Sequence, residues 1–377
     1  MRLERLENIL AEFPKYRRAQ VRRALYENLV ESWSAATALP ADLRSRLERE
    51  VPLSGPEEIA RDPSGESWRR LAVLSDGAKV ESVLIRHRDG RNTVCVSAQS
   101  GCALGCRFCA TAALGEGRNL APGELVEQVL ALARPLRREG GRVGNVVFMG
   151  MGEPFLNYDA VLAAVRELVA PDGLDLAARR VSISTAGIVP GIMRLASEPL
   201  QVNLAVSLHA PDDRLRSDLM PINRRYPLGR LIPAVRDYIA ATGRKVMIEY
   251  LLLDRVNDGP DQARALAELL RGGLGRLFFV NLIRANPARG YAPSSEGRRR
   301  RFQEILEKRG IPWGLRSRFG LGVSGSCGQL AAGKTGSEKT TATARRKDAS
   351  VLPGPGRDGR PRTRKGPGRS DSRPGRR

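Results

Sequence analysis

The stretch "SAQSGCALGCRFCATA", residues 97–112, contains three cysteines, at positions 102, 106 and 109. The 377-residue chain has five cysteines in all, so more than half of them lie in this one segment. Structural zinc uses four ligands, usually supplied as two closely spaced pairs, and this triplet has no fourth member nearby. Three thiolates on an iron–sulfur cluster leave one iron open to bind a substrate directly. The spacing therefore favours an open cluster; the alternative is a zinc site completed by a distant ligand such as His209.

The composition indicates a globular protein of the reducing cytoplasm. Hydrophobic residues make up 41% of the chain, which is enough for a substantial core, and no apolar run approaches the roughly 20 residues that span a bilayer. The N-terminal sequence "MRLERLENILAEFPKYRR" is charged throughout and does not resemble a secretory signal. We expect cytoplasmic localisation and reduced thiols, so a cysteine cluster indicates metal binding or catalysis.

The positive charge of the chain indicates a polyanionic partner. The formal net charge is +22, and residues 333–377, with 14 Lys or Arg and 4 Asp or Glu, account for +10 of it. A basic surface of this size is typical of nucleic-acid binding, although it also serves solubility alone. Residues 333–377 are rich in Gly, Pro, Ser, Thr and Arg and have almost nothing to bury, so this tail is predicted to be disordered.

The first 90 residues are predicted to form two accessory parts. Residues 1–52 carry apolar residues at helical spacing with dense Arg and Lys between them, which suits either a small RNA-binding helical domain or an ordinary packing domain. Residues 53–90 are assigned to a β extension or linker, because "KVESVLIRH" at 79–87 alternates with period two.

From residue 91 to 332, apolar runs alternate with helical stretches. The runs are "NTVCVSAQ", "NVVFMG", "RVSISTAG", "VNLAVSLHA", "KVMIEYLLL" and "LFFVNLI". About six strand–helix units predict an α/β fold with a parallel sheet or partial barrel. Reactive groups in such folds lie at the C-terminal ends of strands. The cysteine triplet, "GMGEP", "STAG" and "SLHA" all follow predicted strands.

Seven segments in order resemble one enzyme family. They are "CVSAQSGCALGCRFCATAALGEGRNL", "FMGMGEPFLNYDAV", "VSISTAGIVPGI", "AVSLHAPDDRLRSDLMPINRRYPL", "EYLLLDRVND", "NLIRANP" and "CGQL". The Cys-x3-Cys-x2-Cys spacing, with Phe108 before the last cysteine, resembles the radical S-adenosylmethionine (SAM) superfamily. The full set resembles the RlmN-type adenine C2-methyltransferases of 23S ribosomal RNA and transfer RNA, with the Cfr-type C8-methyltransferases as near relatives. The resemblance extends from about residue 5 to residue 332.

The resemblance implies a partial (βα)6 radical SAM barrel and assigns its cofactors. Cys102, Cys106 and Cys109 are expected to hold one [4Fe-4S] cluster whose fourth iron binds the amino and carboxylate groups of SAM. That cluster donates one electron, SAM breaks, and a 5′-deoxyadenosyl radical forms. The residues expected to contact SAM are Gly152, Glu153, Ser184, Ser207, Leu208, His209 and Asn286.

The resemblance also assigns roles to the two remaining cysteines. Cys327 is expected to accept a methyl group from a first SAM, and a second SAM then supplies the radical that activates this methyl group for addition to the adenine ring. The covalent protein–RNA adduct is released when Cys95 attacks the Cys327 sulfur, which leaves a Cys95–Cys327 disulfide that must be reduced. Glu81 matches a candidate proton acceptor. A surface or buried structural role is the alternative for Cys95, Cys327 and Glu81.

The expected partners are ribosomal and transfer RNA, an electron donor for the cluster and a reductant for the disulfide, with the enzyme acting as a monomer. One segment departs from the family pattern. "RFGLGVSGS", at 318–326, has glycines where the family usually has acidic residues and alanines. The competing hypotheses are C8 methylation, a radical SAM enzyme of a small molecule, and a non-catalytic RNA-binding protein stabilised by zinc.

Overall fold

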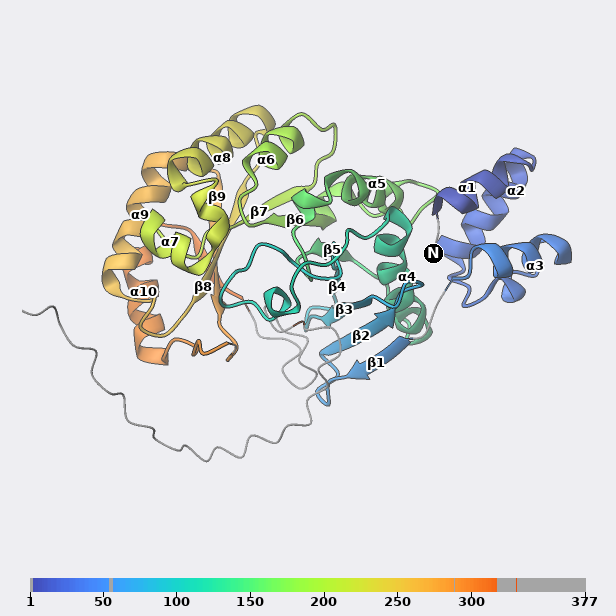
Figure 1. Cartoon of the computed structure of the whole chain (residues 1–377), viewed down its shortest axis with the longest axis horizontal. Helices are drawn as coiled ribbons and strands as arrows, with labels where there is room; N and C mark the ends of the chain where they lie inside the picture. Colours follow the sequence, from blue (N-terminus) through green and yellow to red (C-terminus); the bar gives the residue numbers. More distant parts are fainter. Residues whose placement is uncertain (1–2, 54–56, 288, 317–329, 331–377) are drawn as a thin grey trace, which may run out of the picture. The chain divides into compact units, whose positions relative to one another are not determined.

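One sheet organises the part of the chain that the computed structural model describes, residues 3–53, 57–287, 289–316 and 330 (Figure 1). All of these residues fall in Met1–Gly336, the first of two units into which the chain divides. Within the described residues the sheet has ten strands, in the order β1 to β10. The strands are β1 (Glu57–Arg61), β2 (Ser67–Val73), β3 (Lys79–Arg86), β4 (Asn92–Cys95), β5 (Asn145–Phe148), β6 (Val181–Thr185), β7 (Asn203–Ser207), β8 (Val246–Leu252), β9 (Phe278–Arg284) and β10 (Trp313–Leu315).

The sheet changes from antiparallel to parallel at β4. Strands β1 to β4 pair antiparallel, and every pair from β4–β5 to β9–β10 is parallel. The predicted partial barrel is confirmed, because β4 to β9 are the six predicted runs and helices connect them. The parallel strands place their C-terminal ends at one edge of the sheet, where the site described below lies.

Ten α-helices accompany this sheet in the described residues. The helices are α1 (Leu3–Ala11), α2 (Lys15–Arg22), α3 (Ala41–Glu50), α4 (Pro122–Arg138), α5 (Tyr158–Val169), α6 (Val189–Ala196), α7 (Asp213–Leu219), α8 (Leu228–Thr242), α9 (Pro260–Leu274) and α10 (Glu296–Lys308). A π-helical turn, Arg23–Glu27, continues α2. No helix among the described residues is long and apolar enough to cross a membrane.

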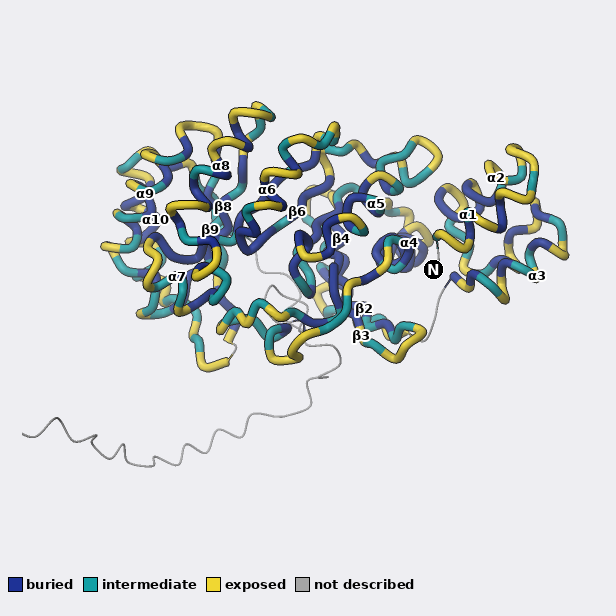
Figure 2. The backbone as a smooth tube through the Cα atoms, turned by 45° about the horizontal axis from the view of Figure 1, so that its top comes forward, coloured by how far each residue is buried: buried dark blue, intermediate teal, exposed yellow. Residues whose placement is uncertain are grey.

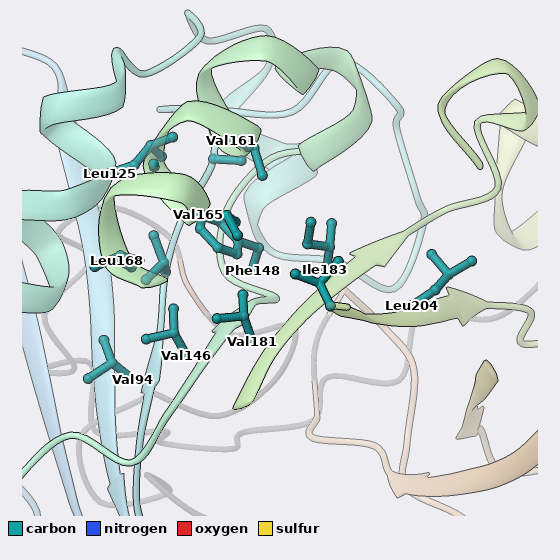
Figure 3. Close-up of a cluster of buried hydrophobic side chains, with 14 of the residues drawn as sticks. Val94, Leu125, Val146, Phe148, Val161, Val165, Leu168, Val181, Ile183 and Leu204 are labelled. Atoms are coloured by element: carbon teal, nitrogen blue, oxygen red, sulfur yellow. The ribbon is translucent and has the colours of Figure 1, made fainter. Parts of the chain in front are cut away.

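Alternating side chains divide the parallel strands between two environments. Val146 belongs to the large core between sheet and helices, whereas the next residue, Val147, belongs to a small cluster on the opposite face with Cys95. Figure 3 shows Leu168 of α5 beside Val146 and Val165 of α5 beside Phe148, all members of the core between sheet and helices. Each such buried aliphatic side chain contributes about 1.5–3 kcal/mol of hydrophobic stabilisation. The strands are therefore buried along most of their length, while the helices alternate between buried and exposed residues (Figure 2).

The N-terminal helices contact the barrel through polar groups as well as through the core. Arg22, which is largely buried, forms an ion pair of 2.9 Å with Glu167 of α5. Arg134 of α4 donates a hydrogen bond of 3.0 Å to the carbonyl of Val30. These contacts hold α2 and the chain at Val30 against α5 and α4.

Three predictions concern positions outside the described residues. They are the placement of Cys327, the altered segment at 318–326, and the disorder of the tail at 333–377.

Candidate active site

A cavity opens at the C-terminal ends of the parallel strands. Strands β5 to β9 and the loop after β4 all contribute to its wall. Its lining includes most of the residues predicted to bind the cluster and SAM, namely Cys102, Cys106, Cys109, Gly152, Glu153, Ser184, Ser207 and His209. The structure thus brings together eight predicted site residues from four separate segments of the sequence.

The loop that carries the cysteines is held in shape by close backbone contacts. The Cys102 backbone N–H donates to the carbonyl of Gly115 at 2.9 Å. A Cβ atom at Gly101 would lie 2.6 Å from that same carbonyl oxygen, so this position accepts only glycine. On the outer side, Arg289 donates to the carbonyls of Cys106 and Cys109, at 3.5 and 3.3 Å. These contacts all involve backbone atoms of the loop. The sulfur atoms of the three cysteines therefore do not take part in them.

The three thiols fit an iron–sulfur cluster better than a single metal ion. All three are free and partly exposed to the cavity. Burial raises the pKa of the Cys102 thiol to about 11 and raises that of Cys106 further. Among the described residues, no three His, Cys, Asp or Glu side chains converge closely enough to hold one ion. A cubane cluster binds each thiolate through a different iron, so it needs no such convergence.

The GMGEP turn after β5 presses against the segment that follows β4. The Met151 N–H donates to the Ser97 hydroxyl at 2.8 Å. Gly152 has a φ of +87°, and a Cβ there would lie 2.5 Å from the Cβ of Gln99. Because no side chain fits at this position and few residues adopt this φ, the turn requires glycine. The turn exposes its backbone to the cavity and aims the next residue, Glu153, inward.

Glu153 is a buried carboxylate at the end of two strands. Its two oxygens accept hydrogen bonds from the backbone N–H groups of Phe155, at 3.0 Å, and Ala186, at 2.7 Å. Burial nevertheless raises the pKa of Glu153 to about 7. A cationic ligand group beside this carboxylate would favour its ionised form. The ammonium group of SAM has the required charge.

The residues at the C-terminal ends of β6 and β7 differ in how they relate to the cavity. Ser184 and Ser207 line it, and so does His209, whose Nδ1 accepts a hydrogen bond from the Leu251 N–H at 3.0 Å. Burial lowers the pKa of His209 to about 3, so this imidazole is neutral at physiological pH. Leu208 packs its side chain into the main core, and its backbone N–H and carbonyl bond to Glu249 and Arg216, so it does not line the cavity. Asn286 is buried just after β9 and does not line the cavity.

Cys95 and Glu81 lie on one face of the sheet. Cys95 pairs with Val83 across β3 and β4, and the side chain of Glu81, two residues before Val83, lies on the same face. Glu81 is fully buried, with Arg69 at 3.2 Å from its carboxylate. Cys95 lies in a small cluster of buried apolar residues that also contains Leu330. Neither Cys95 nor Glu81 belongs to the cavity lining.

Comparisons with known proteins show the family of this chain. The sequence model of the radical SAM superfamily matches residues 96–269. A protein from Roseiflexus castenholzii is 47% identical, over 88% of this chain and 94% of its own, and one from Chloroflexus aurantiacus is 50% identical, over 84% and 87%. Both are named "Probable dual-specificity RNA methyltransferase RlmN". This chain belongs to the RlmN family of the radical SAM superfamily. A crystal structure of a radical SAM methyltransferase from Sphaerobacter thermophilus is similar, with 48% identity, a TM-score of 0.83 and coverage of 88% of this chain and 98% of that one.

Glu249 and Arg316, two cavity residues of this RlmN-family chain, were not predicted from the sequence. Glu249 of β8 pairs in register with Ser207 and with Asn281, so that the three side chains form a polar row across the inner face of the sheet. The Asn281 amide donates to Glu249 at 2.9 Å, and Arg316, just beyond β10, lies 3.7 Å from the same carboxylate. Glu249 begins the segment "EYLLLDRVND" and Asn281 begins "NLIRANP", but neither segment indicates by itself that the two side chains meet.

Arg216 of α7 forms hydrogen bonds with the backbone at the C-terminal ends of β6 and β7. Its buried guanidinium donates to the carbonyls of Ala186, Ser207 and Leu208, at 2.7, 3.1 and 3.1 Å, and to the side chain of Asn223 at 2.7 Å. Burial lowers the pKa of Arg216 to about 10, so it is still charged at neutral pH. One side chain thus fixes the backbone at the C-terminal ends of β6 and β7.

We expect Arg216→Met to lower the free energy of unfolding by about 3–5 kcal/mol, because it leaves several buried carbonyls without donors. The shift of the denaturant midpoint, followed by circular dichroism, measures this. Arg230→Met is the matched control, since Arg230 is exposed, and a surface substitution of this kind changes stability by about 0.5 kcal/mol or less. Equal midpoints for the two variants would contradict the role given to Arg216.

Proposed function

We propose that this RlmN-family protein methylates C2 of adenine in 23S ribosomal RNA and in transfer RNA. The names of its relatives, which describe dual-specificity RNA methyltransferases, support both substrates. The observation that carries the proposal is the position of Leu330. It lies in the apolar cluster of Cys95, and its carbonyl accepts a hydrogen bond from Thr111 of the cysteine loop. Leu330, which follows Cys327 by three residues in the sequence, therefore contacts both the apolar cluster of Cys95 and the loop that carries the cysteine triplet.

Three thiols and one carboxylate are suited to hold the cofactors. Cys102, Cys106 and Cys109 would bind a [4Fe-4S] cluster, which when bound supplies the electron that cleaves SAM to a 5′-deoxyadenosyl radical. Glu153 would accept hydrogen bonds from the SAM ammonium, since its carboxylate faces the cavity and is buried. Ser184, Ser207 and His209 line the remaining wall, where the adenosine part would lie. The resemblance also assigns Leu208 and Asn286 to SAM, although neither residue lines the cavity here.

Cys327 would be the methyl carrier, the role that the resemblance to the family implies for it. Each residue spans at most about 3.5 Å, so three residues keep Cys327 within about 11 Å of Leu330. Its thiolate would take the methyl group of a first SAM. The same sulfur, brought to the cavity, would then present this methyl group as the hydrogen source for a second SAM. Two SAM molecules would be consumed for each methyl group transferred.

Cys95 would resolve the adduct. The ring carbon C2 is electron-poor and has no lone pair to attack an electrophilic methyl group, so a carbon-centred radical derived from the methyl of Cys327 has to add there. The product remains bonded to the Cys327 sulfur until another thiol attacks that sulfur. Cys95 is suited to this attack, because it belongs to the same apolar cluster as Leu330. The resulting disulfide then needs a reductant.

Glu81 would accept the proton that leaves C2 of the adduct. It is a fully buried carboxylate on the face of the sheet that carries Cys95, and Ser97, which follows Cys95 closely, donates its hydroxyl to the Glu81 carbonyl at 2.5 Å. Arg69, 3.2 Å from the carboxylate, would orient it for this role.

The N-terminal helices would provide part of the RNA-binding surface, as a domain of residues 1–52 joined by residues 53–90 to a catalytic domain of residues 91–332. Tyr16 is 60% exposed, and the guanidinium of Arg17 lies 5.1 Å from its ring centre. An exposed aromatic ring beside arginines suits stacking on unpaired bases and binding of phosphates. Together with the net charge of +22, this favours RNA over a small-molecule substrate.

The test is mass spectrometry of nucleosides from ribosomal and transfer RNA incubated with reconstituted enzyme, SAM and reductant. We expect 2-methyladenosine from both RNAs. A product of 8-methyladenosine would establish the Cfr-type reaction instead. A colourless zinc protein that leaves the RNA unmodified would establish a binding protein without this catalysis.

A further inference from the structure

The hydroxyl of Thr111 connects two segments that are far apart in the sequence. It donates a hydrogen bond of 2.8 Å to the carbonyl of Leu330, 219 positions away, and the contact is buried. Thr111 is 3% exposed and Leu330 is 5% exposed, so neither side of the contact has free access to water. A buried carbonyl that lost this donor would leave its hydrogen-bonding capacity unsatisfied. The bond therefore favours one placement of the Leu330 backbone.

The two ends of this contact belong to different parts of the active site. Thr111 follows Cys109 by two residues, lines the cavity and begins the 3₁₀ turn Thr111–Leu114. Leu330 belongs to the apolar cluster that contains Cys95, Val147 and Met151. Leu330 is therefore fixed through its backbone to the cluster loop and through its side chain to the face that carries Cys95.

We propose that Thr111 is a positioning residue that docks Leu330, three residues beyond Cys327 in the sequence, onto the loop that carries the cysteine triplet. The inference rests on the proposed function, because it concerns the residue proposed there as methyl carrier. Thr111 itself touches no reacting atom in this role. Its hydroxyl holds the backbone of Leu330, three residues in the sequence from the proposed methyl carrier, and so favours transfer of the methyl group. Without the bond, SAM cleavage continues, and a larger share of the radicals is lost without methylating RNA.

Three variants separate this role from a general loss of stability. Thr111→Val keeps the shape and removes the hydroxyl, whereas Thr111→Ser keeps the hydroxyl. Thr242→Val is the matched control, because Thr242 also donates its hydroxyl to a backbone carbonyl, that of Tyr238 at 2.7 Å, and lies at the end of α8 outside the cavity.

The first measurement is the ratio of methylated adenosine to 5′-deoxyadenosine formed by reconstituted enzyme with RNA, SAM and reductant. We expect Thr111→Val to lower this ratio by about tenfold, the effect of leaving one buried carbonyl unpaired. Thr111→Ser and Thr242→Val should keep the wild-type ratio. A wild-type ratio in Thr111→Val, or an equal fall in Thr242→Val, would overturn the proposal.

The second measurement is the rate at which N-ethylmaleimide alkylates Cys327, followed by mass spectrometry of the peptide. In the reconstituted enzyme without RNA we expect faster alkylation in Thr111→Val than in the wild type, Thr111→Ser or Thr242→Val. The alkylation rates are also compared in the cluster-free proteins, so that a variant that binds little iron can still be tested. Equal rates in all four proteins would overturn the docking. If the wild type makes no methylated adenosine, the proposed function fails, and the alkylation rates still test the contact.

Discussion

Cys95→Ala is expected to accumulate protein that is covalently attached to RNA, with at most one methylation event per enzyme molecule. The variant keeps the proposed methyl carrier and the cluster ligands, so the adduct can form. It lacks the thiol that would attack the Cys327 sulfur, so the adduct cannot be resolved. On a denaturing gel this species should run as a slow band that ribonuclease collapses.

Two control variants test the order of the steps. Cys327→Ala has no methyl carrier, so its RNA should stay free and unmodified. The Cys95→Ala, Cys327→Ala double variant should also show no slow band, because formation of the adduct precedes its resolution. Cys95→Ala with near-normal turnover and no adduct would show that Cys95 is only a buried residue of β4. Its packing against Val83 and Val147 would then be its whole function.

The sequence predicted those parts of the site that depend on local spacing. The cysteine triplet, the GMGEP turn and the polar ends of β6 and β7 each lie within one short segment. A parallel sheet then brings the C-terminal ends of its strands to one edge whatever the lengths of the connections. For this reason eight of the predicted residues line one cavity although their segments span more than 100 positions.

The site residues that the sequence did not predict are placed by strand register or by contacts between segments far apart in the sequence. Glu249 matters because register pairing places it beside Ser207 and Asn281, and register is fixed only when the strands are assembled. The helix α7 is short, and nothing in its pattern shows that Arg216 turns inward to three carbonyls. The short end strand β10 has three residues, too few for a period-two pattern to be recognised.

Side-chain direction is the other limit, because a family motif does not state which atoms of a residue are used. Leu208 lies in a predicted SAM-binding segment, yet its side chain is fully buried in the main core. The next residue, His209, has a φ of +57°, which turns the chain and brings its imidazole to the cavity. Only the backbone conformation distinguishes the roles of these two neighbours.

Cys106→Ala is expected to abolish reductive cleavage of SAM, which makes it the second variant with a large effect. The triplet has no spare member, and Cys106 is one of three free thiols that line the cavity. Removal of one thiolate leaves two irons of a cubane without protein ligands, so reconstitution should yield little cluster. Iron analysis and the visible absorbance of the protein measure loading, and 5′-deoxyadenosine measures cleavage.

Cys95→Ala is the matched control for this experiment, because it also exchanges a cysteine for alanine and lies outside the triplet. It should load iron and cleave SAM as the wild type does, although it fails later in the cycle. A change at Cys106 also removes contacts with the small cluster of apolar residues around Leu219 and Met220, so thermal melting of the cluster-free variants is compared as well. If Cys106→Ala reconstituted a full cluster and still produced 5′-deoxyadenosine, the triplet would not be the ligand set. The cluster would then have to use a residue from another part of the chain.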